Sequence, residues 1–174
     1  EPRRGAIGRP PYAPGQPGRR TAPRADLRRA PDGPRDRQVN FGADLTLLDE
    51  QDGWSFVQAA MDGYCGWLQT DELGQSQAQI THRVHAPATH AYSEPNMKRR
   101  EVMGLSLGAR LSVAAVQDGF ARLAQGGWVP LQHISDQPEA DPASVAEKLI
   151  GTPYLWGGNS RWGIDCSGLA QAAL

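Results

Sequence analysis

The middle of the chain repeats one order of short motifs, and this repeat limits the fold more than any other feature of the sequence. A Gly-Ala-X-Leu tetrapeptide and an Asp-Gly-aromatic tripeptide each recur 66 residues later, and a Gly-Trp-hydrophobic tripeptide recurs 61 residues later. The pairs are residues 42–45 with 108–111, 52–54 with 118–120, and 66–68 with 127–129. A shared period of this kind indicates two copies of one structural unit, the second with a shorter hairpin turn.

Within each copy the side chains follow a period of two. Short alternating runs such as residues 54–57 are separated by Asp-Gly turns, and no 11-residue window shows a helical stripe. Alternation with such turns is typical of antiparallel hairpins. We therefore expect a mainly β protein with two small antiparallel barrels, at residues 24–73 and 82–136.

The first 23 residues differ in composition from the rest. They contain six prolines, four glycines and five arginines and few side chains that could be buried, which predicts a disordered tail or linker for residues 1–23. Residues 38–174 hold eight basic and fifteen acidic residues, so nucleic-acid binding by the folded part is not expected. The sequence has no apolar run of membrane-spanning length and no signal-like segment, although it starts with Glu1 and its natural start is expected upstream.

After the second repeat, residues 141–174 change character. Asp141 suits an N-cap and Pro142 the first helical position, so a short helix is expected up to Ile150, with Val145, Leu149 and Ile150 facing inward.

Chemistry is concentrated in residues 151–169, which surround Cys166. The small residues after Cys166 and the following Ala-Gln-Ala-Ala-Leu predict a helix that starts at the cysteine. A helix N-terminus favours an anion, so a thiol there is biased towards the nucleophilic thiolate. Glycines before it allow close backbone approach, and Tyr154 supplies a hydroxyl.

This stretch resembles the nucleophile segment of the NlpC-type cysteine peptidases, papain-like enzymes that cut bacterial peptidoglycan stem peptides. The matching positions are Gly151, Pro153, Tyr154, Trp156, Gly157, Gly158, Ser160, Gly163, Asp165, Cys166, Ser167, Gly168 and Leu169. The two repeats resemble the bacterial SH3-like barrels that often precede such domains. The resemblance implies a hydrolase of the cell wall with two SH3-like barrels followed by the opening helices of a papain-like α+β catalytic domain at residues 141–174.

The same resemblance implies roles for individual residues. Cys166 is the expected nucleophile, Tyr154 polarises the substrate carbonyl, Asp165 faces a free amino terminus, and Ser167 binds a carboxylate of γ-linked glutamate. Asp165 could instead only cap the helix, and Tyr154 could be a wall residue. Tyr64, on the Asp62-Gly63-Tyr64 hairpin, is expected to contact a substrate with a free L-alanine, with a place in the barrel core as its alternative.

A catalytic histidine is not evident. All four histidines, His82, His85, His90 and His133, precede Cys166, and the family places the histidine after it. We therefore expect the chain to be C-terminally truncated and inactive as it stands. The spacing of the histidines fits no standard metal site, so neither metal nor cofactor is expected.

The expected activity is that of a γ-D-glutamyl-diamino-acid endopeptidase acting on L-Ala-γ-D-Glu-diamino-acid peptides derived from peptidoglycan. The alternative is a non-catalytic module in which paired SH3-like barrels bind cell-wall peptide. An amidase or acyltransferase of related architecture is a further possibility. The compartment of this bacterial protein stays open, with the cytoplasm favoured slightly over the periplasm or export.

Overall fold

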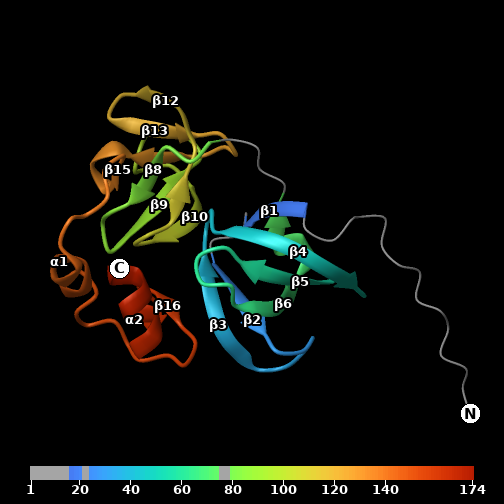
Figure 1. The fold of residues 1–174 in the computed structure, drawn as a ribbon. Coiled ribbons are helices and arrows are strands. Elements are labelled where there is room, and N and C mark those ends of the chain that lie inside the picture. Colours follow the sequence, from blue (N-terminus) through green and yellow to red (C-terminus); the bar gives the residue numbers. More distant parts are fainter. Residues whose placement is uncertain (1–15, 21–23, 75–78) are drawn as a thin grey trace, which may run out of the picture.

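The computed structural model describes residues 16–20, 24–74 and 79–174, and it is mainly β, as the sequence predicts. Its first unit is a seven-stranded sheet in the order β3-β2-β6-β5-β4-β1-β7 (Figure 1). The strands are β1 (Gln16–Arg20), β2 (Arg24–Arg28), β3 (Arg35–Asn40), β4 (Asp44–Gln51), β5 (Trp54–Ala59), β6 (Cys65–Gln69) and β7 (Leu73–Gly74), with a 3₁₀ helix η1 (Thr70–Glu72) before β7.

Alternation along these strands builds the first hydrophobic core. In β5 the side chains of Ser55, Val57 and Ala59 are buried, while Trp54 and Phe56 are partly exposed on the other face. Leu27, Leu45 and Leu68 join this core from β2, β4 and β6. The period of two in the sequence therefore separates an inner from an outer face, as expected for a half-buried strand.

The prediction of a disordered tail is wrong for part of residues 1–23. Residues 16–20 form β1, which pairs with Asp44 to Leu47 of β4 and with β7. Strand pairing uses backbone groups, so a segment with little to bury can still complete a sheet whose neighbouring strand has an unpaired edge. The remainder of the predicted tail, residues 1–15 and 21–23, lies outside the described residues.

The second unit divides its strands between two sheets. A five-stranded sheet has the order β10-β9-β14-β13-β12, and a three-stranded sheet has the order β11-β8-β15. The elements are β8 (His82–Val84), β9 (Ala88–Tyr92), β10 (Glu101–Ser106), β11 (Arg110–Leu111), β12 (Val113–Gln117), β13 (Phe120–Leu123), β14 (Trp128–Pro130), the 3₁₀ helix η2 (Leu131–His133) and β15 (Ile134–Ser135).

Closed barrels are not formed. The first sheet ends at β3 and β7, and the five-stranded sheet ends at β10 and β12. A barrel requires hydrogen bonds between its first and last strands, but β7 has only two residues and β3 is contacted by β16 of the C-terminal segment. The prediction of two barrels is therefore corrected to two units built from open sheets.

Phe41 links the two units. It follows β3 in the first unit, yet its side chain is 2% exposed and lies in the core of the second unit with Val84, Leu105 and Leu111. Its carbonyl accepts a hydrogen bond from the amide of Arg110 at 2.9 Å.

Two neighbouring contacts reinforce this junction. The guanidinium of Arg110 pairs with the carboxylate of Asp44 at 2.5 Å. Gly42, which follows Phe41 in the chain, has a φ of +75°, and a Cβ atom there would lie 2.1 Å from the carbonyl oxygen of Arg110. The close approach of the units therefore requires glycine at this position.

The C-terminal segment contains α1 (Pro142–Glu147), β16 (Asn159–Ser160), β17 (Gly163–Ile164) and α2 (Cys166–Ala173). Asp141 caps α1 as predicted, accepting hydrogen bonds from the amides of Ala143 and Ser144. Val145 and Leu149 are buried as expected, but the helix ends at Glu147 and not at Ile150, and Ile150 is 75% exposed in the turn that follows.

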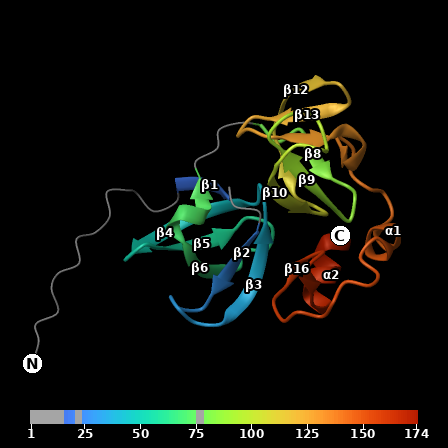
Figure 2. The ribbon, with the colours of Figure 1, turned by 180° about the vertical axis from the view of Figure 1, so that it is seen from behind.

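This segment packs against β3, as both ribbon views show (Figure 2). The side-chain amide of Asn40 donates to the carbonyl of Asn159 at 2.7 Å, and the amide of Asn159 donates to the side chain of Gln38 at 3.3 Å. Gly157 lies so near that a Cβ atom would be 2.8 Å from the carbonyl oxygen of Asp36. Hydrogen bonds from side chains of the first unit to backbone groups of the segment, together with this close approach, therefore hold the segment against the first unit.

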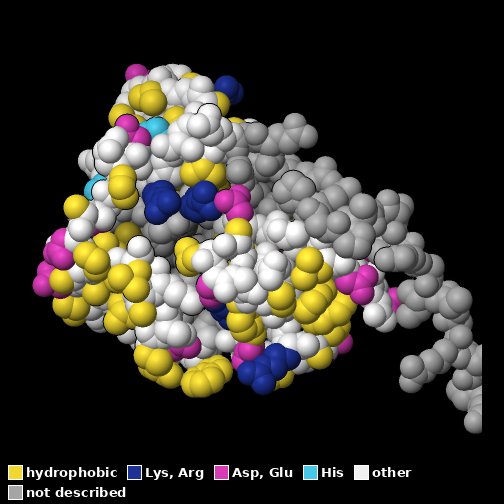
Figure 3. Space-filling view, viewed as in Figure 1, with side chains coloured by type: hydrophobic (Ala, Val, Ile, Leu, Met, Phe, Trp, Pro, Cys, Tyr) yellow, Lys and Arg dark blue, Asp and Glu magenta, His cyan; other side chains and the backbone are white. Residues whose placement is uncertain are grey.

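Among the residues described, no helix has the length and apolar character needed to cross a membrane. Apolar side chains gather on the surface over α1 and α2 (Figure 3). Ile150, Leu169 and Leu174 are exposed there.

Candidate active site

The carboxylate of Asp165 organises the start of α2. One oxygen, Oδ1, accepts hydrogen bonds from the amide of Gly168 at 2.8 Å and from the hydroxyl of Ser167 at 2.7 Å. The other, Oδ2, accepts from the amide of Gly157 at 2.8 Å, so the same side chain caps the helix and fixes the glycine loop. Burial opposes the charge of this carboxylate, but these donors outweigh it and hold its pKa below the ordinary value.

Cys166 is the first residue of α2, as predicted, and it is exposed. Its amide has no hydrogen-bond acceptor among the residues that the structure describes. A free amide beside an exposed thiol at a helix N-terminus is suited to stabilise the negative charge that develops on a carbonyl oxygen when that thiol attacks the carbonyl carbon.

A polar pocket of about 300 Å³ lies between α2 and the first unit. The C-terminal segment contributes Asp165, Ser167 and the glycine loop, and the first unit contributes side chains from β3 and from the turn before β6. It is lined by Asp36, Arg37, Asp62, Tyr64, Gly157, Gly158, Asn159, Asp165, Ser167, Gly168 and Gln171. The pocket is therefore assembled from two segments, residues 36–64 and 157–171, that are far apart in the sequence.

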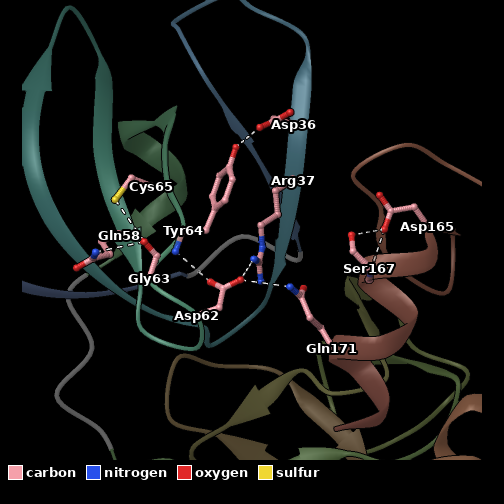
Figure 4. Close-up of polar contacts among 11 residues, drawn as sticks. Asp36, Arg37, Gln58, Asp62, Gly63, Tyr64, Cys65, Asp165, Ser167 and Gln171 are labelled. Carbon is pink, nitrogen blue, oxygen red and sulfur yellow. Dashed lines mark hydrogen bonds and ion pairs between the residues drawn. The ribbon is translucent and has the colours of Figure 1, made fainter.

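One side of the pocket is formed by Tyr64 and Asp36 (Figure 4). The Tyr64 hydroxyl donates to the Asp36 carboxylate, which also pairs with Arg29 at 3.0 Å. Hydrogen bonds from Tyr64 and Arg29 keep the pKa of Asp36 below its ordinary value, so it is ionised at neutral pH. Burial and then Asp36 raise the pKa of Tyr64, which keeps its proton on the phenol.

Asp62 connects the first unit to α2. Its carboxylate pairs with Arg37, accepts the amide of Tyr64 at 3.1 Å, and accepts the side-chain amide of Gln171 at 3.2 Å. The Arg37 guanidinium also lies 5.5 Å from the centre of the Tyr64 ring, within cation–π range. Figure 4 shows these side chains bridging from the hairpin to the helix.

The predicted site residues separate into two groups. Asp165, Ser167 and Tyr64 line the pocket, and Cys166 adjoins it in the chain. Tyr154 does not line the pocket; it is 67% exposed, and its backbone forms a bridge with Ile164. Tyr64 also packs against the first core, and its contact with a substrate stays a prediction.

Five other lining residues were not predicted from the sequence: Asp36, Arg37, Asp62, Asn159 and Gln171. The Asp62-Gly63-Tyr64 turn was a usable signal, because an Asp two residues before an aromatic in a hairpin can bond the aromatic's amide. Asp36 and Arg37 had no local signal, since a charged pair in a strand is ordinarily a solvated face.

The four histidines lie in other surroundings. The ring of His133 contacts the Thr89 hydroxyl at 2.8 Å, and His85 contacts the carbonyl of Gln132 at 3.0 Å. Burial, followed by the charge of His85, lowers the pKa of His133. Among the residues described, no cluster of three or more His, Cys, Asp or Glu side chains could hold a metal ion.

Two segments of this chain match known protein families. Residues 27–73 match the bacterial dipeptidyl-peptidase SH3 domain, and residues 151–174 match the NlpC/P60 family. The second segment contains Cys166, and the first contains all the pocket residues that the first unit contributes.

Two bacterial enzymes are similar over most of this chain. A γ-D-glutamyl-L-lysine dipeptidyl-peptidase from Bacillus subtilis is 27% identical over 150 residues, which are 75% of this chain and 49% of that enzyme. The enzyme of the same name from Bacillus cereus is 25% identical over 160 residues, 77% of this chain and 48% of that enzyme. The chain thus spans about half the length of the curated relatives it matches.

A crystal structure of an NlpC/P60 family protein from Bacillus cereus shares the fold, with a TM-score of 0.76 at 20% identity over 91% of this chain and 71% of that one. The chain is therefore similar to NlpC/P60 family proteins around Cys166 and to bacterial dipeptidyl-peptidases in its SH3 segment.

Proposed function

We propose that the natural protein is a cell-wall cysteine peptidase that cleaves the bond between γ-D-glutamate and a diamino acid in L-Ala-γ-D-Glu-diamino-acid peptides. The observation that carries this proposal is the exposed Cys166 at the start of α2, beside a pocket walled by the SH3 segment. The names of the two Bacillus relatives support the bond and the diamino acid class.

The reaction follows from the position of the thiol. The Cys166 sulfur, as thiolate, attacks the γ-carbonyl carbon of the glutamate, and the unpartnered Cys166 amide helps to stabilise the oxyanion. The C–N bond then breaks, the diamino acid leaves as an amine that takes up a proton, and water hydrolyses the thioester. Tyr154 is exposed, and its backbone forms a bridge with Ile164, so its side chain does not line the pocket. We propose that its hydroxyl contacts the substrate carbonyl only when the substrate is bound.

The charges in the pocket support a peptide with a free amino terminus. Asp36, Asp62 and Asp165 bring three carboxylates to the lining, against the guanidinium of Arg37 in the lining and that of Arg29, which pairs with Asp36 from outside it. An ammonium group gains from such an excess of negative charge, whereas an acylated terminus does not. Asp165 already accepts three hydrogen bonds, so we assign the main ammonium contact to Asp36 beside Tyr64 and leave Asp165 one remaining acceptor position on Oδ2.

A carboxylate of the glutamate needs hydrogen-bond donors. Ser167 is an exposed residue on the first turn of α2, and Arg37 has its Nε atom buried without a partner among the residues described. Arg37 can donate to an anion directly, and Ser167 can do so once its hydroxyl turns away from the Asp165 carboxylate to which it donates here, so we assign the γ-linked glutamate's carboxylate to these two residues.

The proposal requires a general base for the thiol and an acid for the leaving amine. None of the four histidines hydrogen-bonds to Cys166 in the part of the chain described, so we expect the catalytic histidine to come from protein outside these 174 residues and the 174 residues alone to be inactive.

We further propose that residues 82–136 are a second SH3-like unit. Its support is the repeated order of hairpin, third strand, 3₁₀ helix and short strand in both units. Asp52 and Asp118, with φ of 49° and 50°, precede Gly53 and Gly119 with φ of 81° and 78°, which is the geometry of the same hairpin turn in each copy.

The test uses the natural full-length protein and L-Ala-γ-D-Glu-L-Lys, with release of L-Ala-γ-D-Glu followed by mass spectrometry. Cleavage should be abolished by Cys166→Ala and should fall steeply for the same peptide with an acetylated amino terminus. Release, from N-acetylmuramoyl-L-alanine peptides, of the peptide with a free L-alanine amino terminus would instead indicate an amidase.

The non-catalytic alternative gives a different result. If the full-length protein binds the tripeptide but wild type and Cys166→Ala both leave it intact, the protein is a peptide-binding module and the proposal is wrong.

A further inference from the structure

The outer face of the first sheet has an aromatic surface that the proposed peptidase site does not use. The register pairs Trp54 with Gln69 and Phe56 with Trp67, so these side chains share one face of β5 and β6. The Phe56 and Trp67 rings lie 5.1 Å apart between centroids. Figure 3 shows hydrophobic side chains gathered over this part of the first unit. An outer strand face is ordinarily polar, so this surface needs an explanation.

A hollow of about 230 Å³ opens at one end of this surface. Among the residues described it is lined by Arg24, Asp26, Arg28, Trp54, Gln69 and Glu72. None of these six residues lines the pocket beside Cys166, so the two sites are separate. The hollow is slightly smaller than the roughly 300–1,000 Å³ of drug-sized ligand pockets, which suits a single small ring.

The polar groups of the hollow are held in place. The Asp26 carboxylate contacts Arg28 at 3.3 Å and accepts the side-chain amide of Gln38 at 3.2 Å. The Arg24 guanidinium lies 4.9 Å from the centre of the Trp162 ring. Side chains fixed in this way lose little entropy when a ligand binds.

The charges of the lining select the class of ligand. Two guanidinium groups are balanced by two carboxylates, so the hollow has no net charge to attract an anion or a cation. It offers N–H donors and carboxylate acceptors around one indole. A neutral polyol has hydroxyl groups that both donate and accept and a ring face of C–H groups that can lie on an aromatic ring.

We propose that this hollow binds a neutral saccharide, with a sugar ring lying on Trp54 and its hydroxyl groups bonded to the surrounding polar side chains. A hydrogen-bonded chain joins the two sites, because Asp26 accepts from Gln38 and Gln38 accepts from the amide of Asn159, which lines the peptide pocket. A glycan held at Trp54 would therefore adjoin the wall of the pocket proposed for the peptide.

The test is a titration of the ¹⁵N-labelled chain with tetra-N-acetylchitotetraose, observed by NMR. The five tryptophans give five indole N–H signals, and the signal of Trp54 is identified by its loss in Trp54→Phe. We expect a saturable shift of that signal and on the order of ten-fold weaker binding in Trp54→Ala. Gln69→Ala, at an exposed position, should weaken binding several-fold without disturbing the other signals.

Trp156→Ala is the matched control, because Trp156 is 66% exposed and lies outside the hollow. Its affinity for the sugar should equal that of wild type. The proposal is overturned if the sugar causes no saturable shift of the Trp54 signal, or if Trp156→Ala loses as much affinity as Trp54→Ala. It is also overturned if L-Ala-γ-D-Glu-L-Lys, rather than the sugar, shifts the Trp54 signal.

Discussion

Replacing Asp165 by alanine should loosen the segment that presents Cys166. The substitution removes three hydrogen bonds at once: those from the Gly168 amide, the Ser167 hydroxyl and the Gly157 amide. Gly157 is buried, so its amide has no water to replace the lost acceptor. The start of α2 and the glycine loop would both lose their common anchor.

The magnitude follows from two terms. Loss of an N-cap costs about 1 kcal/mol, and a buried amide left without an acceptor costs about 1–3 kcal/mol. We therefore expect the free energy of unfolding to fall by about 2–4 kcal/mol, which for a chain of this length lowers Tm by roughly 4–16 °C.

Thermal unfolding followed by far-ultraviolet circular dichroism measures this change. Asp141→Ala is the matched control, since Asp141 caps α1 but is exposed and serves no second segment. If Asp165→Ala lowers Tm no more than Asp141→Ala does, Asp165 is only a helix cap and the reasoning about Gly157 is wrong.

The same carboxylate predicts a dependence on pH. Its pKa is depressed in the folded state, so its contribution to stability is present above the ordinary value of about 3.9 and is lost as the pH falls through the folded-state pKa. The difference in Tm between wild type and Asp165→Asn should therefore be constant at neutral pH and shrink as the pH falls below about 4. A difference that grows in acid would contradict the assigned direction of the shift.

Three further predictions concern positions away from Asp165. Phe41→Ala should lower the free energy of unfolding, measured with a denaturant, by about 3–5 kcal/mol, because Phe41 is 2% exposed in the second core. Phe56→Ala should lower it clearly less, because Phe56 is partly exposed. Gly157→Ala should cost about 1–3 kcal/mol beyond Gly119→Ala, since both have positive φ but only the Cβ at position 157 would meet backbone; equal losses would exclude the clash. Tyr64→Phe should remove, from a spectrophotometric titration of the tyrosines, one phenol whose pKa lies above the ordinary tyrosine value. If the phenol that disappears has an ordinary pKa, the contact of Tyr64 with Asp36 is contradicted.

Local patterns in the sequence were sufficient to predict the strands and hairpins, but not whether the sheets close into barrels. The alternation in residues 54–57 and the Asp-Gly turns at residues 52–53 and 118–119 predict hairpins, and the structure has them. Whether the end strands of a sheet meet depends on contacts between distant segments. In the first unit the edge of β3 contacts β16, and β4 pairs with β1, so this sheet stays open.

The candidate site was likewise predictable only in part. Asp165, Cys166 and Ser167 could be predicted because they are neighbours in the sequence at the start of one helix. Asp36 and Arg37 enter the site only because β3 passes the glycine loop, with Gly157 close to the carbonyl of Asp36. No local pattern in β3 records that approach, so a charged pair there could not be told from a solvated strand face.

The carboxylate of Asp62 makes the two matched segments depend on each other. It accepts from Gln171 of α2 while it pairs with Arg37 and holds the amide of Tyr64. A displacement of α2 would remove Gln171 as a partner of the carboxylate that holds the Tyr64 amide, beside the proposed ammonium site. Recognition of the peptide's amino terminus and placement of Cys166 should consequently change together, which is why a substitution at Gln171 is expected to affect binding as well as turnover.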